Sequence, residues 1–144
     1  MGTKYSNPGP NWVPAYQASG VPYVTSSAGT HIDATPVEIE FPFVTRFFEI
    51  TNTSDQVMRV GFSTNGINGR AEAQEPTNAR NHYLIVSGGV TTGRLELRCK
   101  KLFFRAEDNA KKVGFSLIAG LTGISEFPPL TGTFDTTASF KGIG

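Results

Sequence analysis

The feature that most constrains the fold of this chain is the strict alternation of side chains over residues 113–121. Every second position in this segment is apolar: Val113, Phe115, Leu117, Ala119 and Leu121. Because successive side chains of a β-strand point to opposite faces, the alternation predicts a strand with one buried face. Short alternating segments of the same kind, each closed by turn residues, follow one another from Val37 onwards. They leave little room for helices, so the sequence predicts an all-β fold.

The order of these segments favours two packed antiparallel sheets. Pro42 interrupts the first alternating segment, which suits an edge strand or a bulge. Residues 46–51 and 57–63 flank a turn rich in Asn, Thr, Ser and Asp, so we expect them to pair as a hairpin. The apolar positions of residues 94–105 change sides at residues 100–101, where a bend would let one strand serve both sheets. About eight short strands at this spacing predict a β-sandwich, of jelly-roll or immunoglobulin-like type.

Composition divides the chain into three parts. Residues 1–36 are rich in Pro, Gly, Ser and Thr and carry scattered aromatic rings, so we expect an extended N-terminal arm. Residues 37–124 form the expected sandwich core, and residues 125–144 an extended segment packed on the sandwich or on a neighbour. We expect the core to fold without residues 1–30, unless the stretch 23–25 supplies a strand. The possible inter-subunit contacts in the arm are Trp12, Tyr16, Gln17 and Tyr23.

Charge and cysteine content exclude several classes of partner. The net charge is +1, which gives no electrostatic case for binding nucleic acid or a membrane surface. Only 17% of the residues are charged, so we expect partners to cover part of the surface. Cys99 is the single cysteine, which excludes an intramolecular disulfide and favours assembly in a reducing compartment. No apolar run approaches the length of a transmembrane segment.

The sequence does not assemble a catalytic or metal-binding set. His31 lies near Asp33, but no third ligand accompanies them. Cys99 alternates with Leu95 and Leu97, which is the position of a small buried residue and not of an activated nucleophile. The carboxylates and basic residues of the expected strands belong to solvated faces. We therefore expect no enzyme activity, no catalytic residue, no cofactor and no metal.

A long polar loop from Asn65 to about Asn81 is a candidate either for recognition of a ligand or for contact with neighbours in an assembly. Loops of this length in a compact domain are usually functional. The residues that could form an exposed recognition surface there are Asn68, Arg70, Glu72, Glu75 and Arg80. Tyr83 follows the loop and could stack on a sugar ring. These residues support the alternative function of a glycan- or receptor-binding β-sandwich on a virion or phage tail surface.

Several stretches of the chain carry a resemblance to a known family. They are Tyr16–Ser27, Arg46–Asp55 with Met58–Ser63, Gly93–Arg105 and Gly114–Thr122. These stretches resemble the small penton proteins, single jelly rolls that occupy the fivefold vertices of large icosahedral double-stranded DNA viruses. The likeness spans most of the chain and carries over no catalytic residues, because the family has none.

The resemblance implies a specific fold and function. The fold would be a single jelly-roll sandwich of about eight antiparallel strands with an extended N-terminal arm. The protein would be a structural capsid protein, a homopentamer of upright jelly rolls assembled inside the host cell and located in the virion. Its partners would be itself, the surrounding major capsid protein and internal minor capsid proteins, with no direct nucleic acid contact.

Overall fold

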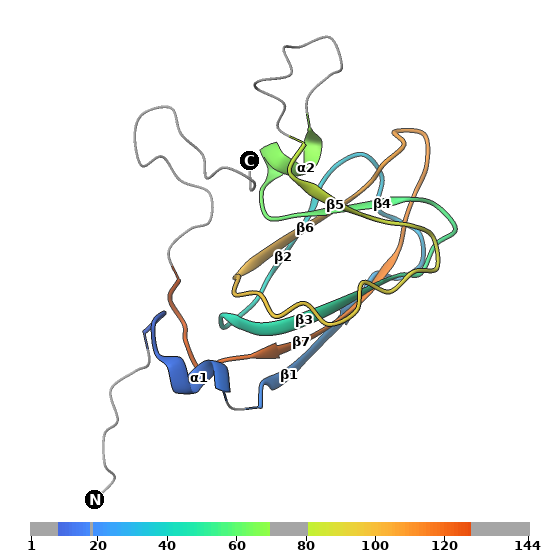
Figure 1. The fold of residues 1–144 in the computed structure, drawn as a ribbon. Coiled ribbons are helices and arrows are strands. Elements are labelled where there is room, and N and C mark those ends of the chain that lie inside the picture. The colour runs from blue at the N-terminus through green and yellow to red at the C-terminus, as the bar shows by residue number, and fades with distance from the viewer. Residues whose placement is uncertain (1–8, 18, 70–80, 128–144) are drawn as a thin grey trace, which may run out of the picture.

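Two antiparallel β-sheets pack face to face in the computed structural model, which describes residues 9–17, 19–69 and 81–127 (Figure 1). The first sheet has the order β1 (Val21–Ser26), β7 (Phe115–Leu121), β3 (Thr45–Asn52). The second has the order β2 (Val37–Glu40), β6 (Lys101–Ala106), β4 (Met58–Gly61), β5 (Tyr83–Val86). The described helices are short: α1 (Val13–Gln17) and α2 (Thr64–Asn68). The prediction of an all-β sandwich is confirmed.

Residues 90–97 run beside β3 and extend the first sheet by an irregular fourth segment. Phe48 and Leu95 exchange two backbone hydrogen bonds of 2.9 and 2.8 Å. The backbone N–H of Thr92 donates to the carbonyl of Ile50 at 2.8 Å. The pairs of neighbouring segments are therefore nested: β1 with β7, β2 with β6, β3 with residues 90–97, and β4 with β5. The chain is arranged as one long antiparallel hairpin that is folded across two sheets.

The alternation of residues 113–121 produces the buried face that it predicts. All five apolar positions are at most 3% exposed, whereas Ile118 on the opposite face is 47% exposed. Phe115 stacks against Phe104 of β6 with ring centroids 4.2 Å apart and planes 2° from parallel. This contact joins the central strands of the two sheets. On the outer face, a Cβ at Gly120 would overlap the ring of Phe47, so glycine lets that ring lie flat on the sheet.

The predicted bend at residues 100–101 is also confirmed. The chain leaves the first sheet after Leu97 and enters the second sheet at Lys101, where β6 begins. Buried Thr45 fixes this crossing, because its Oγ1 donates to the carbonyl of Leu97 at 2.7 Å and accepts from the N–H of Cys99 at 2.9 Å. The N–H of Thr45 also donates to the carbonyl of Cys99 at 3.0 Å.

The predicted hairpin between residues 46–51 and 57–63 is wrong. β3 and β4 lie in different sheets. β3 already has β7 on one side and residues 90–97 on the other, so it has no free edge for β4. The turn between them crosses the end of the sandwich, where the buried Asn52 side-chain amide donates to the carbonyls of Gln56 and Val86 at 2.6 and 2.9 Å.

The segment expected as an extended arm supplies structure to the domain. Val21–Ser26 is a strand, β1, and every residue of it has a register partner in β7. Tyr23 packs edge-on against Phe41 at 5.2 Å, so its ring belongs to the domain's own interior. Val13–Gln17 is helical. Composition indicated an arm because residues 21–26 are too short to show alternation clearly, and their buried face exists only next to β7.

We predict that Phe115→Asp abolishes soluble folding. The substitution places an unpaired carboxylate where Phe115 is 3% exposed and stacked on Phe104, at a cost of about 4 kcal/mol or more, against a typical total stability of about 5–15 kcal/mol. Circular dichroism and size-exclusion chromatography measure the outcome. Ile118→Asp, on the exposed face of the same strand, is the matched control and should fold. A folded Phe115→Asp variant would contradict the assigned core.

We also predict different results for two N-terminal truncations. Removing residues 1–30 deletes β1 and exposes the edge of β7, so this variant should not fold to a soluble domain. Removing residues 1–18 leaves β1 in place and should lower the melting temperature only moderately. Thermal unfolding followed by circular dichroism tests both variants. Equal melting temperatures for the longer truncation and the full chain would show that β1 contributes nothing to the fold.

Candidate functional site: the two edges of the sandwich

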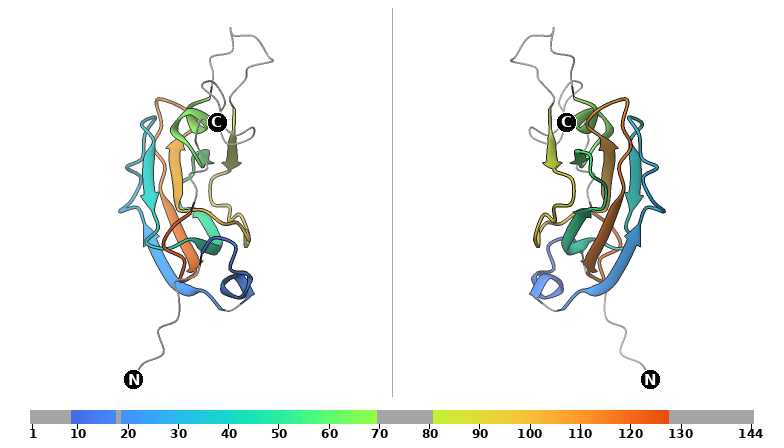
Figure 2. Two further views of the ribbon diagram at one scale, coloured as in Figure 1. Left: turned by 90° about the vertical axis from the view of Figure 1, so that its left-hand side faces the viewer. Right: turned by 90° about the vertical axis from the view of Figure 1, so that its right-hand side faces the viewer.

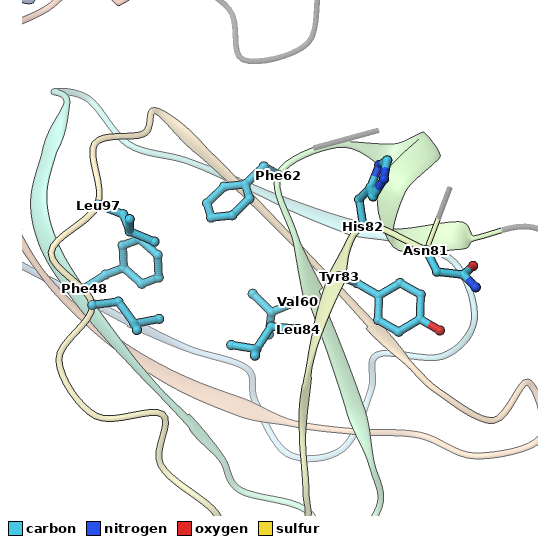
Figure 3. A pocket seen from close by; sticks show the side chains of 9 residues that line it. Phe48, Val60, Phe62, Asn81, His82, Tyr83, Leu84 and Leu97 are labelled. Carbon is cyan, nitrogen blue, oxygen red and sulfur yellow. The ribbon is translucent and has the colours of Figure 1, made fainter. Parts of the chain in front are cut away.

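One edge of the sandwich is open and forms an apolar groove between β5 and residues 90–97. The groove has a volume of about 460 Å³. Its lining comes from both sheets and from the residues before β5: Phe48, Val60, Phe62, Asn81, His82, Tyr83, Leu84, Leu95 and Leu97. Figure 3 shows the side chains of Phe62, Leu84 and Leu97 around a common space. We call this side of the molecule the groove edge.

The groove edge exposes large apolar side chains. Leu84 is 48% exposed, Ile85 is 52% exposed and Leu97 is 44% exposed. Single exposed leucines are ordinary, but neighbouring ones around a concave apolar surface mark a site of association. At one end of the groove His82 contributes a buried Nδ1 that has no hydrogen-bond partner among the described residues.

The opposite edge is formed by β1 and β2, and Figure 2 shows these strands on the side of the sandwich away from β5. The contact between Tyr23 and Phe41 closes the space between the sheets on this side. Its outer surface is mixed: Val24 is 72% exposed on the outer face of the first sheet, and Glu38 and Glu40 are exposed on the outer face of the second. Glu38 forms an ion pair of 2.9 Å with Lys101. We call this side the acidic edge.

Basic side chains hold the described terminal segments against the sandwich. Arg46 Nε donates to the carbonyl of Tyr16 at 2.6 Å, and Arg98 Nη1 donates to the carbonyl of Pro10 at 3.2 Å. The Arg98 guanidinium also lies 5.0 Å from the ring of Tyr16 and 5.9 Å from the ring of Phe127. α1 and the residues that follow β7 are thus placed side by side at one end of the molecule (Figure 1).

The predicted inter-subunit residues divide into two kinds. Trp12, 51% exposed, and Gln17 lie on the surface and are available to a partner. Tyr16 and Tyr23 are half-buried and contact their own domain; the Tyr16 hydroxyl donates to the carbonyl of Pro10 at 2.7 Å. The aromatic content of the N-terminal segment therefore serves the chain's own fold as well as its surface.

Two arginines brace the base of the long loop. Arg59 donates to both carboxylate oxygens of Glu107 and to the carbonyls of Ile67 and Asn68 at 3.1 and 3.0 Å. Arg105 donates to Asn68 Oδ1 at 2.9 Å. The hydrogen bond from Arg59 lowers the pKa of Glu107, and burial lowers the pKa of Arg105. The last turn of α2, from which the loop departs, is fixed by these contacts.

The recognition residues predicted on the loop are only partly within the structure. Asn68 is exposed, with its Oδ1 accepting from Arg105. Arg70, Glu72, Glu75 and Arg80 lie outside the described residues. The guanidinium of Arg59 lies 4.2 Å from the centroid of the Tyr83 ring and covers one of its faces. A sugar could stack only on the other face, which weakens the case for Tyr83 as a stacking platform.

The remaining chemical candidates are placed as structural residues. Cys99 is fully buried, and burial raises its pKa to about 11, so the thiol is not an activated nucleophile. The Asn52–Ser54 triplet matches a glycosylation acceptor, but the Asn52 amide is buried and donates two hydrogen bonds. Across residues 9–17, 19–69 and 81–127, no group of three or more His, Cys, Asp or Glu side chains is placed to hold a metal ion. No helix of the described residues is long and apolar enough to cross a bilayer.

The groove edge was not predicted from the sequence. Phe48 and Val60 belong to alternating strands and look like ordinary core residues. One signal was present: Tyr83–Val86 is apolar on both faces, although a strand at a sheet edge with one solvated face would alternate. A continuous apolar run in an edge strand indicates that the second face of the strand also makes apolar contacts.

We predict that Glu107→Gln makes stability less sensitive to acid. The pKa of Glu107 is lower in the folded state than its ordinary value of 4.5, so the ion pair stabilises the fold above that pH and is lost as the pH falls through the folded pKa. At neutral pH the variant should lose about 1 kcal/mol or less, because Glu107 is partly exposed. Urea unfolding at pH 7 and below pH 4 measures this, and the difference from the parent chain should shrink in acid. A constant difference would contradict the assignment.

Comparison of the chain with protein-family models, with curated proteins and with solved structures finds no significant match.

Proposed function

We propose that the protein is a structural capsid subunit that forms a pentamer at the fivefold vertices of an icosahedral virion. The proposal combines the resemblance to penton proteins with the geometry of the sandwich. In the virion it would contact the surrounding major capsid protein and internal minor capsid proteins. The observation that carries the proposal is the groove edge, where an open apolar surface between two sheets is left uncovered by the described chain.

The nested pairing of the strands supports the jelly-roll part of this proposal. A jelly roll is a sandwich of eight strands in which a long antiparallel hairpin is rolled across two sheets. Here the outermost pair is β1 with β7 and the innermost is β4 with β5. Counting residues 90–97 as a strand gives four segments in each sheet. This is the arrangement expected of a single jelly roll.

The surface chemistry supports a structural role. The chain has few charged residues, and apolar side chains such as Val24, Leu84 and Ile118 are exposed on its strands. A symmetric assembly buries such surfaces in repeated contacts. Within the described residues Cys99 is buried, and His31 is exposed without belonging to a group of three or more His, Cys, Asp or Glu side chains that could hold a metal ion.

Two measurements test the proposal: the oligomeric state of the full chain in solution and its position in assembled shells. Native mass spectrometry and light scattering should give a pentamer of the 15.5 kDa chain, and electron microscopy should show fivefold rings. Co-expression with the major capsid protein of the same virus should place the labelled chain at vertices. A chain that remains monomeric at high concentration, and binds sugars on a glycan array, would overturn the proposal in favour of the glycan-binding alternative.

A further inference from the structure

We propose that residues 130–140 add a strand to the free edge of β5 and place their apolar side chains in the groove of the same copy. These residues lie outside the described part of the chain. Three observations support this occupant: the exposure of the groove's inward-facing side chains, the pattern of residues 130–140, and the place where the described chain ends. The inference does not depend on the proposed pentamer.

The groove contains side chains that face the interior and are not covered. Leu84 is paired with Val60, which is 5% exposed, and it shares a face of β5 with Val86, which is 2% exposed. Leu84 itself is 48% exposed, and Leu97 on the other border of the groove is 44% exposed. An inward-facing residue of an edge strand is covered when another strand follows it. The groove (Figure 3) therefore has the place of a further apolar segment.

The backbone of β5 is open at the same place. Over residues 9–17, 19–69 and 81–127, β5 pairs with β4 alone and ends its sheet. An edge strand with apolar side chains is a template on which an extended segment adds by backbone hydrogen bonds. The acidic edge differs, because the contact between Tyr23 and Phe41 closes it. A strand added to β5 would pair this backbone and cover the groove together.

Residues 130–140 have the side-chain pattern of such a strand. Pro129 has no backbone N–H, so regular pairing can begin after it. All the apolar residues of the segment stand at even-numbered positions: Leu130, Phe134, Ala138 and Phe140. All the odd-numbered positions are polar: Thr131, Thr133, Asp135, Thr137 and Ser139. This alternation predicts a strand with one buried and one solvated face, which is what closing the groove requires.

The described chain ends beside its own groove. The carbonyl of Ser125 accepts from Lys100 Nζ at 2.9 Å, and the ring of Phe127 lies 5.9 Å from the Arg98 guanidinium. The terminal segment thus passes residue 100 and then residue 98, and the next residue in that direction, Leu97, lines the groove. Residues 128–133 span up to about 20 Å when extended. The groove of the same copy is therefore within reach of Phe134.

Hydrogen exchange of the full chain tests the inference. In the parent chain the amides of residues 83–86 and of residues 130–140 should both be protected. Phe134→Asp puts a carboxylate into the apolar groove and should speed exchange in both segments by about tenfold or more. Thr133→Asp changes the solvated face of the same segment, so this matched control should exchange as the parent chain does.

The groove side is tested by a second pair of variants. Leu84→Asp should speed exchange in residues 130–140, whereas Ile85→Asp, on the opposite face of β5, should not. The amides of β7 should stay protected in all four variants, which shows that the sandwich is folded. Unprotected residues 130–140 in the parent chain, or protection that Leu84→Asp leaves unchanged, would overturn the inference.

A disulfide determines whether the segment and the groove belong to one copy. Leu84→Cys is combined in turn with Phe134→Cys, Ala138→Cys or Phe140→Cys; the native Cys99 is buried and stays out of the reaction. Under mild oxidation at least one pair should close within a single chain and migrate as a monomer on a non-reducing denaturing gel. Bonds between chains alone would overturn the assignment to the same copy. No bond in any of the three pairs would overturn the inference as a whole.

These outcomes are separate from the test of the proposed function. A monomeric chain in which residues 130–140 are protected would overturn the pentamer and leave this inference standing. A pentamer in which residues 130–140 exchange freely would do the reverse. With the groove filled, a neighbouring copy would meet this edge at side chains such as Ile85, which is 52% exposed on the other face of β5.

Discussion

The stack of Phe104 on Phe115 is the contact on which the rest of the fold depends. Each ring comes from a strand that has neighbours on both sides, β6 in the second sheet and β7 in the first. Both rings are buried, and their parallel packing holds the two sheets together. Because interiors are packed as densely as organic crystals, the positions of the outer strands follow from this central contact.

The asymmetry of the sandwich follows from what fills the space at each side of that centre. Tyr23 and Phe41 bridge the sheets at one edge. At the other edge the space between the sheets opens into the groove, which Phe48 and Val60 line together with Phe62. The two edges of the sandwich are therefore structurally different, unlike the sides of a closed symmetric barrel.

The sequence predicted those features that depend on local alternation. The buried face of β7, the burial of Cys99 and the change of sheet near Lys101 each follow from the order of apolar side chains along one segment. Local alternation does not determine which strands pair with one another. The pairing of β3 with β7 was missed, and a strand at residues 23–25 was kept only as an alternative to the arm, because both pairings join residues far apart in the sequence. The groove was missed because its walls come from both sheets.

The nested pairing has a consequence for how the protein can be made. β1 can form its hydrogen bonds only with β7, so during synthesis on the ribosome Val21–Ser26 waits for Phe115–Leu121 to emerge. Domains dominated by such distant pairings fold slowly and expose strand edges while they wait. The innermost pair, β4 with β5, is the first that a growing chain can complete. The interval in which the growing chain needs chaperones should therefore lie between the appearance of β5 and that of β7.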